Sequence, residues 1–250
     1  MTTASPAGDG LTGDRILGGR LSLVQTSDGY RAGMDAILLA SAIRLAPGAR
    51  AAEFGCGPGA ALLCAAHACP DAHITGVELD PRAADLARRN AAANGMEDRI
   101  TIVEGDALTW RPGAALDAVF FNPPFFDDPQ ALRAPKPGKT AAWISEAPLA
   151  DWISAGLKRL KSGGSLTLIH RADRLGEALT ALQGRASMVV LPVHPRAGAP
   201  AKRILIEARA GGRAPLALLP PLVLHEDGSG AWTARADALL RGQARLEMRA

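Results

Sequence analysis

Residues 51–60, which read AAEFGCGPGA, decide the fold of this chain. The apolar start of this stretch predicts a buried strand, and the alanine-rich run through Ala68 predicts a helix closed by Pro70. The glycines between them let the backbone turn tightly and approach another group closely. A strand, a glycine-rich turn and a helix in that order are typical of nucleotide-binding sheets. We therefore expect an open α/β sheet whose ligand lies at the carboxyl ends of its strands.

The spacing of the glycines fits two kinds of site. Gly55, Gly57 and Ala60 match the dinucleotide-binding pattern G-x-G-x-x-G/A. A second pattern, E-x-G-x-G-x-G, is typical of enzymes that use S-adenosylmethionine. In this chain it is made by Glu53, Gly55, Gly57 and Gly59. The glycine turn alone does not decide between the two cofactors.

Carboxylates follow the next two predicted strands. Strand 73–79 ends near Glu78 and Asp80, and either side chain could bind the two hydroxyls of a ribose. Strand alternation places both on one face, but Asp80 precedes a proline as a helix N-cap does, which leaves Glu78 for the ribose. Asp106 follows strand 99–103 and could accept a hydrogen bond from an adenine amino group. The alternative for Asp106 is an ordinary turn aspartate.

A fourth predicted strand, 116–121, is followed by Asn122, Pro123, Pro124 and Phe125. Two prolines cannot continue a central strand, so the strand ends there. The Asn122 side-chain oxygen and the Pro123 carbonyl could each accept one N–H bond from an amino group on a planar ring. Phe125 could stack on the same ring. A plain proline-rich turn is the alternative, and the motifs upstream favour the ligand-binding interpretation.

Length and charge limit the class of protein. The 250 residues suit one α/β domain with an extension, or two small domains. We predict a disordered tail over residues 1–13 and a single domain over residues 14–250. That domain would include a lead-in over 14–48 and a C-terminal extension over 211–250. A net charge of +3 and a pI near 9.0 are compatible with a nucleic-acid partner but do not require one.

Three observations concern compartment and metal. The longest apolar runs are too short to span a bilayer, and residues 1–13 lack the features of a secretory signal. Cys56, Cys64 and Cys69 form no C-x-x-C pair, and their odd number is typical of reduced thiols inside the cell. We therefore expect a cytoplasmic protein with no membrane partner and no bound metal.

The sequence also predicts the local structure around Asp35 and after residue 146. Asp35 is expected either to N-cap a helix of roughly ten residues or to face a ligand. Residues 146–161 show the apolar periodicity of a helix, which Gly163 and Gly164 should end. A fifth strand should then run over residues 165–169, and residues 187–193 and 203–209 are two further strand-like runs.

Taken in order, these motifs resemble those of the class I S-adenosylmethionine-dependent methyltransferases. The matching residues are Glu53 to Gly59, Glu78, Asp106 and Asn122 to Phe125. More narrowly, the chain is similar to the bacterial tRNA1(Val) adenine-37 N6-methyltransferase family. The added similarities are Tyr30 to Ala40, Phe126, His194-Pro195-Arg196 and Pro221 to Thr233. Phe125 departs from that family, which more often has Tyr there; stacking is kept and a hydroxyl is lost.

The resemblance implies a Rossmann-like fold, with a seven-stranded sheet that is parallel except for one strand near the end, and with helices on both faces. It implies that Glu78 holds the cofactor ribose, that Asp106 and Ala107 hold the adenine, and that the glycine turn holds the methionine end. Asn122 would border the cofactor as well as the substrate. The catalytic residues would be Asn122, Pro123, Pro124 and Phe125, acting on the exocyclic amine of adenine in RNA, with tRNA as the expected partner.

Several alternatives stay open at this stage. Protein-glutamine N5-methyltransferases use the same tetrapeptide on a similar amide, but usually carry a helical domain before the glycine turn. A nicotinamide oxidoreductase would explain the glycine turn and not the tetrapeptide. A non-catalytic RNA-binding module with a vestigial cofactor fold is a third possibility. Basic loops at 133–139 and 196–203 could contact RNA phosphates or be solvated, and the sequence does not decide.

Overall fold

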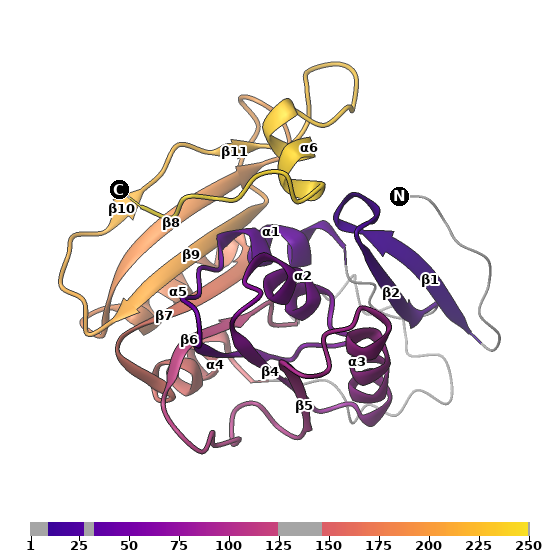
Figure 1. The fold of residues 1–250 in the computed structure, drawn as a ribbon. Coiled ribbons are helices and arrows are strands. Elements are labelled where there is room, and N and C mark those ends of the chain that lie inside the picture. The colour runs from indigo at the N-terminus through magenta and orange to yellow at the C-terminus, as the bar shows by residue number, and fades with distance from the viewer. Residues whose placement is uncertain (1–9, 28–32, 125–146, 250) are drawn as a thin grey trace, which may run out of the picture.

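The computed structural model describes residues 10–27, 33–124 and 147–249, and in these ranges the main sheet has nine strands. Their order is β10-β8-β9-β7-β6-β3-β4-β5, and β11 also pairs with β8 (Figure 1). The strands are β3 (Arg50–Phe54), β4 (His73–Glu78), β5 (Ile100–Glu104), β6 (Leu116–Phe121), β7 (Leu160–Arg171), β8 (Ala186–His194), β9 (Arg203–Ala210), β10 (Ala217–Leu218) and β11 (Leu222–Val223).

The prediction of a mostly parallel sheet is confirmed, and the predicted strand count is corrected. Strands β3 to β9 are the seven that were expected, and β9 runs antiparallel to both of its neighbours, β7 and β8. Two further strands of two residues each, β10 and β11, pair in parallel with successive parts of β8. They cover the outer edge of β8, which would otherwise expose unpaired backbone groups.

Helices cover both faces of the sheet, as predicted. One face packs against α1 (Met34–Ala42), α2 (Ala60–Ala68), α3 (Pro81–Ala93) and α6 (Ala234–Leu240). The other packs against α4 (Leu149–Leu157) and α5 (Leu175–Leu182). Neighbouring residues of β6 show the alternation directly, because Phe120 belongs to the first layer and Phe121 to the second. Both rings are fully buried, so the register of β6 is fixed from two sides.

An antiparallel hairpin precedes α1 and lies beside α3 (Figure 1). It consists of β1 (Leu11–Ile16) and β2 (Leu21–Thr26), joined by a short 3-10 turn over Leu17–Gly19. The prediction of a disordered tail over residues 1–13 is therefore wrong from Leu11 onward. The composition of the tail suggested disorder, but pairing with β2 satisfies the backbone groups of this segment. Residues 1–9 lie outside the described ranges.

Asp35 does not cap α1. The helix begins at Met34 after Gly33, which places Asp35 in the first turn. There its Oδ2 accepts a hydrogen bond from Arg203 Nε at 2.9 Å. A carboxylate in the first turn also interacts favourably with the helix dipole.

The helix predicted over 146–161 is shorter, because α4 ends at Leu157 and β7 already begins at Leu160. Gly163 and Gly164 thus lie inside β7 and do not end a helix. They accompany a register shift between β6 and β7, where Gly163 has φ +74°. A Cβ on Gly164 would lie 3.1 Å from the Asp117 carbonyl oxygen, so this close approach of two strands requires glycine.

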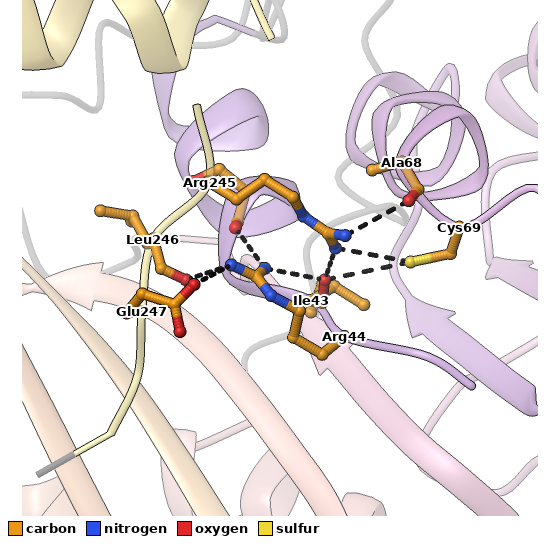
Figure 2. A network of polar contacts seen from close by, with 8 residues as sticks. Ile43, Arg44, Ala68, Cys69, Arg245, Leu246 and Glu247 are labelled. Carbon is orange, nitrogen blue, oxygen red and sulfur yellow. Dashed lines mark hydrogen bonds and ion pairs between the residues drawn. The ribbon is translucent and has the colours of Figure 1, made fainter. Parts of the chain in front are cut away.

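The C-terminal segment, residues 243–249, returns to the ends of α1 and α2 (Figure 2). Leu246 and Met248 are buried in the same core as α1 and α2. The backbone N–H of Leu246 donates to the Ser41 carbonyl at 3.0 Å.

Two arginines fasten this segment to the helix ends (Figure 2). The Arg245 guanidinium donates to the carbonyls of Ile43 and Ala68. Arg44 donates to the Leu246 carbonyl at 2.6 Å. The last carbonyls of a helix lack partners within the helix, and a cation near them is favourable. The pKa of Arg44 is lowered by burial and by the neighbouring Arg245.

Replacing Leu246 with alanine should lower the free energy of unfolding by about 2–5 kcal/mol, because a fully buried leucine leaves a cavity. Chemical denaturation measures this change. Glu247→Ala is the matched control: its exposed carboxylate makes one 3.4 Å ion pair with Arg44, and such pairs contribute about 0–1 kcal/mol. Equal losses in the two variants would show that the tail is not anchored through Leu246.

Candidate active site

The carboxyl ends of four parallel strands meet at one edge of the sheet. Phe54, the last residue of β3, pairs with Val77 in β4 and with Phe121 in β6. Glu78, the last residue of β4, pairs with Glu104 in β5. Neighbouring strands lie about 4.8 Å apart. The residues that follow these strands therefore emerge at the same level, as the sequence predicted.

The glycine turn links β3 to α2, and its glycines have left-handed backbone angles. The values of φ are +65° at Gly55, +54° at Gly57 and +91° at Gly59. A Cβ on Gly55 would lie 3.2 Å from the ring of Trp152, so this packing also leaves little room for a side chain there. A Cβ on Gly57 would meet no described atom within 4 Å. Gly57 thus supplies a backbone conformation and leaves open space for a ligand.

Glu78 is bonded to the glycine turn. Its Oε2 accepts from the Gly57 N–H at 2.7 Å, and its Oε1 accepts from the Asp80 N–H at 2.9 Å. Burial raises the pKa of Glu78, while the backbone N–H donors oppose that shift. A carboxylate has about four lone-pair sites, so both oxygens can still accept hydroxyl donors. Asp80 caps α3 by accepting from the Arg82 N–H at 2.8 Å, which confirms its prediction as an N-cap.

Glu53 is buried beneath the turn, with 3% of its surface exposed. Its Oε2 has no hydrogen-bond partner among the described residues. Burial, together with the charge of Glu78, raises the pKa of Glu53 well above its usual value. A cationic group bound beside the turn would favour the ionised form and satisfy this oxygen.

Asp106 and Ala107 follow β5 on the far side of Glu78. The Gly105 N–H donates to the Glu78 carbonyl at 2.8 Å, which places Asp106 next to that strand end. Asp106 Oδ1 accepts from the Leu108 N–H at 2.8 Å, as a turn aspartate does, and no described residue bonds Oδ2. The Ala107 side chain is buried in the second core, so it could reach a ligand only through its backbone.

Three features of the site were not predicted from the sequence. Leu79 is 39% exposed beside Glu78 and offers an apolar surface to a ring; its signal is an apolar residue between two strand-end carboxylates. Gly76 lies under the turn, where a Cβ would come within 2.7 Å of Cys56 Sγ. The packing of Trp152 against Gly55 had no local signal, because the two residues belong to distant segments.

The described part of the tetrapeptide lies at the end of β6. Asn122 is half-buried, Pro123 is buried and Pro124 is exposed. Phe125 lies outside the described residues, as do Tyr30, Phe126 and the basic loop 133–139, so their predicted roles remain predictions.

Metal-binding clusters and membrane-spanning helices are both absent from the described residues. The described residues contain no cluster of three or more His, Cys, Asp or Glu that could hold a metal ion. Among them, no helix has the length and apolar character needed to cross a bilayer. Cys56, Cys64 and Cys69 are free and buried. Burial raises the pKa of the Cys64 thiol to about 12, so it is not a reactive thiolate.

Residues 32–188 match the methyltransferase small domain family, and this match includes the whole arrangement described above. The chain belongs to that family. The glycine spacing was compatible with a dinucleotide or with S-adenosylmethionine. Membership of a methyltransferase family decides for S-adenosylmethionine. It also agrees with the charges: a dinucleotide would bring its anionic pyrophosphate to this turn, beside Glu53 and Glu78.

Curated relatives carry the name tRNA1(Val) (adenine(37)-N6)-methyltransferase. The relative from Porphyromonas gingivalis is 35% identical over 166 residues, which are 62% of this chain and 64% of that protein. The alignment thus spans less than two thirds of that relative. The relative from Aeromonas hydrophila is 30% identical, over 72% of this chain and 77% of its own length.

Solved structures agree on the fold. A predicted O-methyltransferase from Agrobacterium tumefaciens aligns with a TM-score of 0.71 and 30% identity, covering 85% of this chain and 98% of that one. An S-adenosylmethionine-dependent O-methyltransferase from Thermotoga maritima aligns with a TM-score of 0.50 and 19% identity, covering 72% and 64% of the two chains. The second likeness concerns the fold alone.

The site suits S-adenosylmethionine, which carries a sulfonium and an ammonium cation. The unsatisfied oxygen of Glu53 and the open space at Gly57 fit the methionine end. Glu78 retains acceptor capacity for ribose hydroxyls, and Leu79 with Asp106 borders the place expected for adenine.

The buried Glu53 should make stability depend on pH. The pKa of a glutamate in the unfolded chain is near 4.5, and in the native state that of Glu53 is higher. Above pH 4.5 unfolding therefore releases a proton, so the free energy of unfolding falls as pH rises. Glu53→Gln cannot titrate at this position, so its unfolding free energy should fall less steeply as pH rises above 4.5. Urea denaturation at a series of pH values above 4.5 measures both slopes.

Glu104→Gln is the matched control, since Glu104 ends the neighbouring strand β5 with an exposed side chain. Its slope should equal that of the wild type. Identical slopes for the wild type and Glu53→Gln would mean that Glu53 is already ionised in the native protein.

Proposed function

We propose that this protein transfers a methyl group from S-adenosylmethionine to the exocyclic N6 amine of adenine in tRNA. The observation that supports the proposal most is the shared level of three features at one sheet edge. These are the glycine turn after Phe54, the carboxylate of Glu78, and Asn122 with its proline pair after Phe121. The names of the curated relatives support adenine in tRNA as the substrate. A tRNA substrate implies a cytoplasmic location.

The proposed mechanism relies on hydrogen-bond acceptors. An aromatic amine is a poor nucleophile because its lone pair is delocalised into the ring. Asn122 Oδ1 and the Pro123 carbonyl would accept its two N–H bonds and localise the lone pair on nitrogen. S-adenosylmethionine, when bound, supplies an activated methyl group. The nitrogen that accepts the methyl group then releases one proton to water, because that proton becomes acidic only after the transfer. Positioning and electrostatics would then carry the reaction, without a strong base, and Phe125 would stack on the base. An anticodon-loop adenine is already unpaired, which lowers the cost of splaying it out.

A basic rim at the same edge of the sheet supports an RNA partner. Arg171 ends β7 and lies directly opposite Arg203, the first residue of β9. Arg171 is three residues beyond Leu168, the partner of Phe121, so it projects about 10 Å past the end of β6. The two side chains share a face because they form a cross-strand pair.

The β8–β9 loop adds two exposed cations to this rim, Arg196 and Lys202. Arg171 and Arg203 bond to Asp173 and Asp35, which neutralise much of their charge. The described structure gives Arg196 and Lys202 no ion pair. We therefore assign the phosphate contacts of the loop at 196–203 to these two residues.

Asn122→Ala should lower kcat for RNA methylation by about 100-fold or more, because the variant loses an acceptor aimed at the reacting amine. The affinity for S-adenosylhomocysteine should change little, since the glycine turn and Glu78 are intact. Methylation of tRNA in vitro, followed by nucleoside mass spectrometry, measures the first quantity and calorimetry the second. A variant as active as the wild type would remove Asn122 from the mechanism. Methylated glutamine in protein, in place of N6-methyladenosine, would favour a protein-glutamine methyltransferase.

Lys202→Glu and Arg196→Glu should each raise the KM for tRNA severalfold with little change in kcat. Each should also reduce the slope of log affinity against log salt concentration by about 1, as expected for a lost phosphate contact. Filter binding of tRNA over a series of salt concentrations measures the slope.

Arg213→Glu is the control for charge. Arg213 is also exposed, but it follows the other end of β9, at the opposite edge of the sheet. It should leave the KM and the salt slope unchanged. Equal effects at all three positions would indicate only a general attraction between a basic protein and RNA.

A further inference from the structure

Asn90 joins three segments of the protein through one buried amide. It lies in α3 and is 1% exposed. Its Oδ1 accepts from the Val24 N–H at 2.8 Å, and its Nδ2 donates to the Val24 carbonyl at 2.8 Å. The same Nδ2 donates to the Pro58 carbonyl at 2.8 Å. Both N–H donors of the amide are therefore used, one on the hairpin strand β2 and one on the glycine turn.

Asn94, one helical turn later, makes a matching contact with the same hairpin. It accepts from the Ser22 N–H at 3.0 Å and donates to the Ser22 carbonyl at 2.8 Å. Its other N–H goes to the Asn90 carbonyl at 2.7 Å, within its own helix. Ser22 and Val24 are alternate residues of β2, so their backbone groups face the same side. The two amides thus pair with β2 as a third strand would, and only Asn90 reaches the glycine turn.

The glycine turn is consequently held from two directions. Glu78 accepts from the Gly57 N–H, and Asn90 donates to the carbonyl of the next residue, Pro58. Gly57 and Gly59, on either side of Pro58, both have left-handed φ values. Glycine is conformationally permissive, so a turn with this composition needs outside contacts to stay in one conformation.

We propose that Asn90 is a positioning residue for the cofactor site, which fixes the glycine turn and couples it to the β1–β2 hairpin. The inference rests on the proposed use of S-adenosylmethionine at this turn. Because the coupling is reciprocal, a ligand that orders the turn also stabilises the docked hairpin. The hairpin is then part of the cofactor site without touching the cofactor.

The test compares Asn90→Ala with Asn94→Ala. Both variants lose one two-bond contact with β2, so both should lower the melting temperature. Only Asn90→Ala also frees the Pro58 carbonyl. In the ligand-free proteins, amide hydrogen exchange over residues 55–60 should be faster in Asn90→Ala than in Asn94→Ala. The Kd for S-adenosylhomocysteine should rise about tenfold in Asn90→Ala, equivalent to 1.4 kcal/mol, and less than twofold in Asn94→Ala.

Equal exchange rates over the turn in the two variants would overturn the inference. So would an equal loss of affinity in both, since hairpin docking alone would then explain it. If Asn90→Ala does not fold, the wild type decides: saturating S-adenosylhomocysteine should slow exchange at Val24 in β2, and unchanged exchange there would overturn the coupling. A wild type that binds no S-adenosylhomocysteine would overturn the proposed function, while the ligand-free exchange comparison would still decide the role of Asn90.

Discussion

The shared register of β3 with β4 and β6 is the constraint on which the site depends. Phe54 lies opposite Val77 on one side and Phe121 on the other. Phe120 packs into the layer of α1 and α2, and Phe121 into the layer of α4 and α5. A slip of one residue would exchange these layers for every side chain of the strand. The core therefore sets the level at which Gly55 and Asn122 emerge.

Charge at this edge shows a conflict between stability and binding. Burial raises the pKa of both Glu53 and Glu78, and the charge of Glu78 raises the pKa of Glu53 further. Two ionised carboxylates without a cation are unfavourable there. A ligand with positive charge beside the turn relieves that cost. The two buried carboxylates are thus unfavourably placed in the ligand-free protein. The same placement makes the site complementary to a cation.

Segments from both ends of the chain brace the helices on one face. The hairpin strand β2 pairs with the amides of Asn90 and Asn94 on α3. The C-terminal segment is tied to the ends of α1 and α2 through Arg44 and Arg245 (Figure 2). Of these helices, α2 begins directly after the glycine turn and α3 reaches the turn through Asn90. Contacts between residues more than 60 positions apart in sequence therefore help to hold the shape of the site.

The family resemblance implied that one strand near the end of the sheet is antiparallel. Local patterns in the sequence determined the seven main strands, the glycine turn and the capping role of Asp80. Each of these depends on a few neighbouring residues, whose periodicity or backbone restriction acts within one element. The tertiary structure alone decided that Leu11 already belongs to a strand, that Gly163 lies within β7, and that Asp35 faces Arg203. It also decided that Asn90 serves the glycine turn. Those outcomes depend on partners that are distant in the chain, and a buried amide or an early strand acquires its role only when folding supplies the matching backbone groups.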